Sequence, residues 1–440
     1  MVQSSASSAA FILVLSLGIT IQLCVFLPYK VVEAIIFSSS TCRPASNGDI
    51  NKLLIIGLGG VGLQVADLAI EEEEAIQIFG TVRKSSMNDR EINALHGNCL
   101  ETKEIVKVLF DPVCVRKHLF GCEDNKKTDE SSITAATHVL FTIPLSKEND
   151  LVMKAVLREL REWWETTQEN NGGSMDSDSD KGCDSKVLGI VSTTGVYGNH
   201  DGEVVKESSK RLCEETSNAD LYRRFEDEWI TLTGNDGGVK VEVETQSNNN
   251  GSHCRRRLCI FRCAGIYDSS RSALHTVYKN LAVTTRANSS SPPTKSGNKT
   301  NRIHARDLAR GVLSGMFQKG NHTDDSGVGI YNLADNLPEE RSVVLSYARE
   351  LLSSIGIDQR KSRTEAATNP VASNDRLLSR SSTTRQKRRE RESKLVSNQR
   401  LREELLQKDG LLFPTYREGL CAILNDPSTP WQQDQREGSN

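Results

Sequence analysis

One glycine-rich corner constrains this chain more than any other feature. The short apolar run Lys52–Ile56 leads directly into the sequence GLGGVG at 57–62, and apolar residues then recur at helical spacing over Val61–Ile70. This pattern predicts a strand, a tight turn and a helix. In such a corner the first glycine permits the turn, the second lets the backbone approach a diphosphate, and the last lets the helix pack on the strand. The helix N-terminus adds N–H groups and a partial positive charge. The candidate cofactor-binding residues here are Gly57, Gly59, Gly60 and Gly62.

Strand and helix patterns continue to alternate after this corner. Apolar runs that predict strands are followed by stretches with helical periodicity, which is typical of a parallel sheet with helices on both faces. The pattern therefore predicts an α/β fold with a doubly wound parallel sheet, and the alternation is less clean in the second half of the chain. We expect strands at 52–56, 75–79, 105–110, 138–143, 187–191 and 258–263, and helices at 61–70, 150–165, 221–232, 305–317, 341–355 and 397–406.

The end of the second predicted strand distinguishes between two dinucleotides. NAD binding calls for a carboxylate about 20 residues after the glycines, to accept from the ribose 2′-hydroxyl. The chain instead has Arg83 and Lys84, followed by two serines. A guanidinium can bind a 2′-phosphate with a fork of donors. We therefore expect NADP as the cofactor, with NAD as the alternative.

Composition limits the remaining classes. Fifty-five Lys and Arg against 58 Asp and Glu give a net charge of −3, which argues against a nucleic-acid partner. The eleven cysteines and eight histidines have no metal-site spacing, so we expect no metal. Residues 10–27 form an uncharged, mostly apolar run. Its length and position predict a membrane anchor or a targeting signal, to the endoplasmic reticulum or a plastid, with a cytoplasmic location as the alternative.

Another segment of the sequence resembles a motif of a known protein family. Ser192-Thr-Thr-Gly-Val-Tyr-Gly198 resembles the S-[ST]-x-x-V-Y-G segment of the extended short-chain dehydrogenases/reductases, the NAD-dependent epimerase/dehydratase family. Four further segments agree with that family in their order, and the last two resemble an atypical branch of it. They are 261–267 (FRCAGIY), 302–309 (RIHARDLA), 331–335 (YNLAD) and 413–420 (FPTYREGL).

The resemblance implies an organisation and two more cofactor contacts. It implies an NAD(P)-binding Rossmann domain and a smaller C-terminal α/β substrate lobe that closes over the substrate. Asp111 matches a position that commonly contacts the adenine, and Pro144 lies on a loop beside the cofactor. The expected organisation is a targeting or anchor segment with a linker at 1–48, the Rossmann domain with polar insertions at 49–268, the lobe with a disordered insertion at 358–392 within 269–424, and a flexible tail at 425–440.

The catalytic residues implied by the resemblance are only partly present. Thr193 stands where the family has a Ser or Thr that polarises a carbonyl. The family's Tyr-x-x-x-Lys pair, which transfers a proton, is absent at its usual place, where Asn218 and Tyr222 stand. Counting back from Glu226, which resembles an acid at the end of the family's helix, gives the same register. The candidate catalytic residues are therefore Thr193 with either Tyr222 or Tyr197.

Two functions follow from these residues. The first is NAD(P)-dependent oxidoreduction or epimerisation of a small carbonyl, hydroxyl or sugar-nucleotide-like substrate. The second is a non-catalytic dinucleotide-binding sensor or scaffold, which the missing Tyr-x-x-x-Lys pair favours. The substrate and the oligomeric state stay open.

Overall fold

A computed structural model describes most of the chain after residue 50. The described residues are 51–72, 76–82, 105–110, 112–120, 136–146, 150–166, 186–233, 256–284, 299–317, 327–357 and 393–437. The apolar segment 10–27 and the insertion expected at 358–392 lie outside them, so both stay predictions. Among the described residues, no helix combines the length and the apolar character that crossing a membrane requires.

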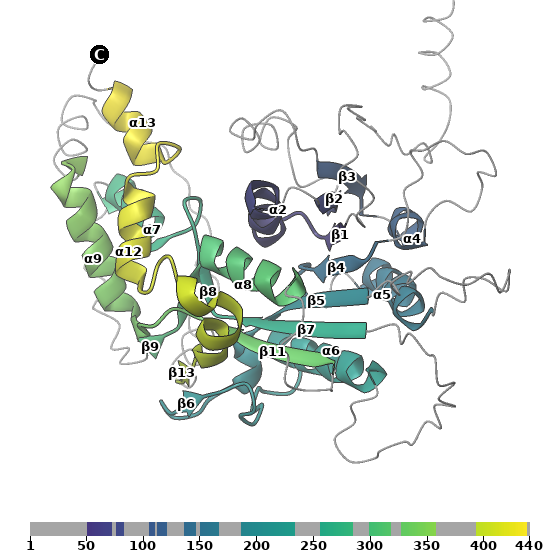
Figure 1. The fold of residues 1–440 in the computed structure, drawn as a ribbon. Helices are drawn as coiled ribbons and strands as arrows, with labels where there is room; N and C mark the ends of the chain where they lie inside the picture. Colours follow the sequence, from purple (N-terminus) through teal and green to yellow (C-terminus); the bar gives the residue numbers. More distant parts are fainter. Residues whose placement is uncertain are drawn as a thin grey trace, which may run out of the picture. The chain divides into compact units, whose positions relative to one another are not determined.

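Seven parallel strands form the central sheet, in the order β3-β2-β1-β4-β5-β7-β11 (Figure 1). The strand β1 lies inside the sheet, and the later strands extend the sheet first to one side and then to the other. The order therefore switches between β1 and β4, where a doubly wound sheet binds its ligand at the carboxyl ends of the strands. The strands are β1 (Asn51–Ile56), β2 (Ile76–Val82), β3 (Ile105–Leu109), β4 (His138–Phe141), β5 (Lys186–Thr193), β7 (Arg256–Cys263) and β11 (Val328–Leu333).

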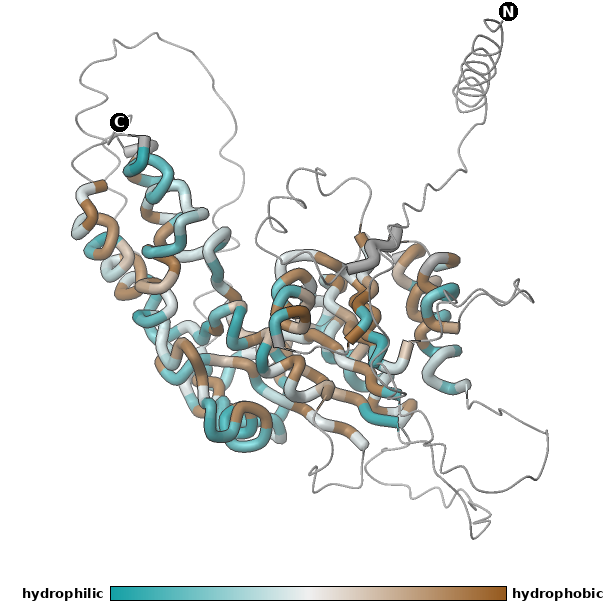
Figure 2. Tube along the Cα trace, turned by 45° about the horizontal axis from the view of Figure 1, so that its top comes forward, coloured by the Kyte–Doolittle hydropathy of each residue, from teal (hydrophilic) through white to brown (hydrophobic). Residues whose placement is uncertain are grey.

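Helices cover both faces of this sheet. Leu53 and Ile55 of β1 pack with α2 and α8 on one face, whereas Leu54 and Ile56 pack with α4, α5 and α6 on the other. Burial on both sides explains why these strands are nearly continuous apolar runs, and Figure 2 shows hydrophobic stretches along them. The expected Rossmann fold class is confirmed. The helices are α2 (Gly60–Glu72), α4 (Pro112–Phe120), α5 (Asp150–Glu165), α6 (Asn218–Leu232) and α8 (Ala305–Phe317).

A smaller C-terminal part has a core of its own. Its helices pack on one another around Trp431 and Leu352, both fully buried. These helices are α7 (Ala273–Thr284), α9 (Arg341–Ser354), α12 (Tyr416–Leu424) and α13 (Pro430–Glu437). Short strand pairs connect this part to the sheet: β8 (Gly265–Tyr267) with β10 (Arg302–His304), β9 (Lys299–Thr300) with β12 (Glu339–Glu340), and β6 (Val204–Val205) with β13 (Leu395–Val396).

Three details depart from the expected organisation. Residues 269–424, which were expected to form the lobe, also contribute the strand β11 to the central sheet and the helix α8 to one of its faces. Residues 425–440 are not simply a flexible tail: α13 forms there, because Pro430 suits a first helical position and Trp431 enters the core. The helix expected at 397–406 is a π-helix, η3, over Leu401–Leu406, followed by a 3-10 turn, η4, over Gln407–Asp409.

Candidate functional site

The glycine corner lies between β1 and α2, at the strand-order switch. Gly57 has a φ of +107°, which side-chain-bearing residues rarely adopt. A Cβ on Gly62 would lie 2.3 Å from the carbonyl oxygen of Gly57, so only glycine allows this contact between helix and turn. At Gly59 and Gly60, by contrast, a Cβ would meet no described residue within 4 Å. The corner is therefore tightly packed behind and open in front, which is the shape that a diphosphate needs.

Electrostatics at this corner favour an anion. The helix α2 begins at Gly60, and the first turn of a helix leaves N–H groups without intrahelical acceptors. Those N–H groups and the helix dipole attract negative charge. The residues present thus fit the diphosphate of a dinucleotide.

Of the other predicted cofactor contacts, one can be located. Pro144 is exposed on the loop that follows β4. This loop packs against the glycine corner, since a Cβ on Gly57 would lie 2.7 Å from Cγ1 of Ile143 and 2.8 Å from Oγ1 of Thr142. The remaining predicted contacts lie outside the described residues and stay predictions: Arg83, Lys84 and Asp111.

Thr193 ends β5 and caps the 3-10 helix η2 (Thr194–Tyr197). Its half-buried hydroxyl oxygen accepts a hydrogen bond from the N–H of Gly195 at 3.0 Å. In the described part of the chain this hydroxyl acts only as an acceptor, so its own proton is available to a ligand. Such a donor suits the role that the resemblance implies for Thr193, which stays a prediction.

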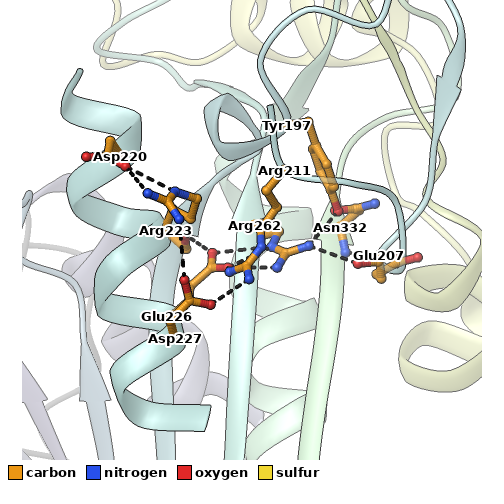
Figure 3. Close-up of polar contacts among 10 residues, drawn as sticks. Tyr197, Glu207, Arg211, Asp220, Arg223, Glu226, Asp227, Arg262 and Asn332 are labelled. Atoms are coloured by element: carbon orange, nitrogen blue, oxygen red, sulfur yellow. Dashed lines mark hydrogen bonds and ion pairs between the residues drawn. The ribbon is translucent and has the colours of Figure 1, made fainter. Parts of the chain in front are cut away.

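Tyr197, the second predicted tyrosine, is fully buried. Its hydroxyl donates to Oδ1 of Asn332 at 2.7 Å and accepts from Nη1 of Arg262 at 2.9 Å (Figure 3). Burial raises the pKa of this phenol, although the Arg262 guanidinium acts in the opposite direction. Both contacts occupy the Tyr197 hydroxyl inside the protein, so its position favours Tyr222 over Tyr197 for proton transfer. The choice between the two tyrosines stays a prediction.

Tyr222 is placed differently. It is half-buried on α6, and its phenol oxygen accepts the backbone N–H of Leu145 at 3.2 Å. Leu145 belongs to the loop after β4, whose residues Thr142 and Ile143 pack against Gly57. Burial raises the pKa of Tyr222, while the Leu145 N–H lowers it. A hydrogen bond donated to the phenol oxygen favours the phenolate, which is what a neighbouring cation would also do.

A buried ion pair one turn further along α6 holds this helix on the sheet (Figure 3). Glu226 is fully buried, and its carboxylate lies 2.7 Å from Nη2 of Arg262 on β7, which is 2% exposed. Ser192 on β5 donates to the same carboxylate at 2.5 Å. Burial alone lowers the pKa of Arg262, but the Glu226 carboxylate raises it above its ordinary value, so the guanidinium stays charged. This pair fixes the side of α6 that carries Tyr222.

Sequence reasoning assigned no role to Arg262. A signal was present, because a charged residue in the apolar strand LCIFRC is almost never buried unless it is paired. The partner could not be identified from the sequence, since Glu226 lies 36 residues away. Within the described part of the chain, no group of three or more His, Cys, Asp or Glu residues could hold a metal ion.

Comparison with known proteins finds solved structures that have a similar fold. No protein-family model and no curated protein sequence matches the chain. Among solved structures, a functionally unknown conserved protein from Silicibacter pomeroyi is 20% identical, with a TM-score of 0.50 over 86% of this chain and 100% of that one. A dTDP-glucose 4,6-dehydratase from Bacillus anthracis, solved with NAD, is 12% identical, with a TM-score of 0.53 over 87% and 99%.

A third structure is a UDP-Glc/GlcNAc 4-epimerase from Campylobacter jejuni. It is 13% identical, with a TM-score of 0.50 over 87% of this chain and 99% of that one. At these identities the likeness concerns the fold, and it spans nearly the whole length of each neighbour. The chain thus shares the fold of these neighbours, and this agrees with the fold that the resemblance to the NAD-dependent epimerase/dehydratase family implied.

Proposed function

We propose that the chain is an NAD(P)-dependent oxidoreductase or epimerase that acts on a small carbonyl, hydroxyl or sugar-nucleotide-like substrate. The hydrogen bond from Leu145 to Tyr222 carries this proposal, because it joins a proton-donating group to the loop that packs against the glycine corner. The open space at Gly59 and Gly60 supports cofactor binding at that corner.

The proposed chemistry divides the work between cofactor and chain. A bound nicotinamide cofactor supplies the hydride chemistry. The N–H groups at the start of α2 bind its diphosphate. Thr193 donates a hydrogen bond to the substrate oxygen and orients it. Tyr222 transfers the proton to or from that oxygen, and the Leu145 N–H stabilises the phenolate that is left behind.

NADP is the preferred cofactor in this proposal. Arg83 and Lys84 follow β2 directly in the sequence, and their charges suit a 2′-phosphate. NAD is the alternative, since the Bacillus anthracis neighbour was solved with NAD.

The proposed substrate class rests on the neighbours and on the lobe. The names of two neighbouring enzymes include the sugar nucleotides dTDP-glucose and UDP-Glc. We assign substrate recognition to the part of 269–424 that packs as a separate core, around α7, α9 and α12.

Replacing Tyr222 with phenylalanine tests the proton-transfer role. We expect kcat to fall by about 100-fold or more, because the variant keeps the ring but loses the proton that general acid catalysis needs. The affinity for cofactor should change by less than about twofold, since the ring still fills its place. The measurement is nicotinamide absorbance with NADPH or NADH and a panel of carbonyl compounds and sugar nucleotides.

A matched control is Tyr331→Phe, which removes a phenol oxygen from β11 on the sheet face that α2 and α8 cover, opposite the face that α6 covers. It should leave kcat unchanged. Full turnover by Tyr222→Phe would remove Tyr222 from the mechanism.

Replacing Arg83 with alanine tests the choice of dinucleotide. We expect the affinity for NADPH to fall by about 10- to 100-fold, the loss typical of a charge-assisted contact, while the affinity for NADH changes little. Fluorescence titration with both coenzymes measures the two dissociation constants. Equal weakening of NADPH and NADH would reject the role of Arg83.

The alternative function is a non-catalytic dinucleotide-binding protein. It is favoured by Asn218, which stands at the position of the family's tyrosine and is exposed. Tight coenzyme binding without turnover across the whole panel would support this alternative over an enzyme.

A further inference from the structure

Two threonine hydroxyls hold Gly57 from opposite sides. Thr81 is buried on β2, and its Oγ1 accepts the N–H of Gly57 at 2.8 Å. Thr142 directly follows β4, and its Oγ1 donates to the carbonyl oxygen of Gly57 at 2.5 Å. The same Oγ1 lies 3.3 Å from the carbonyl oxygen of Ile56, which is a second, longer acceptor. Because β2 and β4 are the two neighbours of β1 in the sheet, the turn is tied to both flanking strands just where β1 ends.

This arrangement determines where the rest of the corner lies. The carbonyl oxygen of Gly57 also accepts the N–H of Gly59 at 2.9 Å, and the Cα of Gly62 packs against it. The orientation of the Gly57 peptide therefore sets the position of Gly59 and the start of α2. A glycine at positive φ has little conformational preference of its own, so the constraint must come from its neighbours.

We infer that Thr81 and Thr142 are positioning residues of the diphosphate site, which hold the Gly57 turn in the conformation that a dinucleotide diphosphate binds. The inference rests on the proposed dinucleotide binding and adds to it two residues that do not contact the ligand. A preformed turn binds more tightly, because the ligand does not have to order it.

The test compares two ligands that differ in the diphosphate. NADPH contains the diphosphate that the glycine corner is proposed to bind, whereas 2′-AMP carries the adenine and the 2′-phosphate but no diphosphate. NADH and adenosine form the equivalent pair if NADH is the tighter ligand.

In the full chain, Thr81→Val and Thr142→Val should each weaken binding of the dinucleotide about 10-fold and binding of the fragment less than about twofold. Thr81→Ser and Thr142→Ser keep the hydroxyl and should bind within about twofold of wild type.

The chain offers a matched control at the opposite end of the same strands. Thr137 accepts the N–H of Lys52 at 3.1 Å and donates to its carbonyl oxygen at 3.3 Å, so it ties the start of β1 as Thr142 ties its end. Thr137→Val loses the same kind of backbone contact away from the corner. It should leave both affinities unchanged, and thermal unfolding of all variants reports any general loss of structure.

The outcomes separate the inference from the function it rests on. Wild-type protein that binds neither dinucleotide would overturn the proposed function, and the inference with it. A wild type that binds, with valine variants that lose the dinucleotide and the fragment equally or lose neither, would overturn the inference alone. Failure of the serine variants to restore binding would do the same.

Discussion

Replacing Arg262 with methionine is expected to lower the free energy of unfolding by about 3–5 kcal/mol. The substitution leaves the fully buried Glu226 carboxylate with the Ser192 hydroxyl and a long 3.4 Å contact to Arg211. An unpaired charge in the interior is far less stable than a paired one, although the pair itself stabilises little relative to well-packed apolar residues. Urea unfolding of the full chain, followed by circular dichroism, measures the effect.

Two further variants test whether the loss of stability comes from leaving a buried charge unpaired. Arg161→Met breaks an ion pair with Glu228 that also joins α5 to α6, but both partners are nearly half exposed. Its expected effect is below about 1 kcal/mol, because exposed pairs contribute little. Combining Arg262→Met with Glu226→Gln should recover part of the loss, since no buried charge remains. A loss for Arg262→Met as small as for Arg161→Met would contradict this interpretation.

The second large effect depends on pH and involves Asp335, after β11. This carboxyl group is 3% exposed; Oδ1 accepts the N–H of Leu337 at 3.3 Å, and Oδ2 has no hydrogen-bond partner among the described residues. Burial raises its pKa to about 7. Glu418 and Asp307 contribute to this rise, whereas the Leu337 N–H and Arg302 oppose it. The ionised form is therefore disfavoured in the folded chain.

The direction of the pH effect follows from this shift. The folded chain binds the Asp335 proton more tightly than the unfolded chain, so the contribution to stability falls as pH rises from about 4 to about 7, and is constant above that range. Asp335→Asn keeps the acceptor for Leu337 and cannot ionise. Relative to wild type, it should be nearly neutral at pH 4 and more stable by up to about 4 kcal/mol at pH 8, from about 3 pKa units at about 1.4 kcal/mol each.

Urea unfolding of both proteins between pH 4 and pH 8.5 measures this difference. Asp409→Asn is the control, because it removes the same formal charge from a side chain that is 83% exposed. Its unfolding free energy should stay within about 1 kcal/mol of wild type. Curves for wild type and Asp335→Asn that run parallel over the whole range would rule out a buried, destabilising carboxylate.

Much of the sheet was predictable from local patterns. Strands buried on both faces are apolar runs, such as 52–56, and the glycines at 57–62 mark the turn that follows. The C-terminal elements were harder, because their signals are weak. The helix α13 has mainly polar residues, and its position depends on Trp431, which reaches a core contributed by distant segments.

The candidate site was predictable only where its residues lie close together in the sequence. The glycine corner is such a segment. The two tyrosines were not distinguishable, because burial of Tyr197 depends on Arg262 and Asn332, which lie 65 and 135 residues away. The same holds for Thr142, which contacts Gly57 across 85 residues and is an ordinary threonine in the sequence.

The measurement that tests the central claim most directly is a calorimetric titration of the full chain with NADPH and with NADH. The account predicts saturable binding of one dinucleotide per chain, because the open backbone at Gly59 and Gly60 and the start of α2 suit a diphosphate. The absence of binding heat with both coenzymes, each at millimolar concentration, would contradict the account.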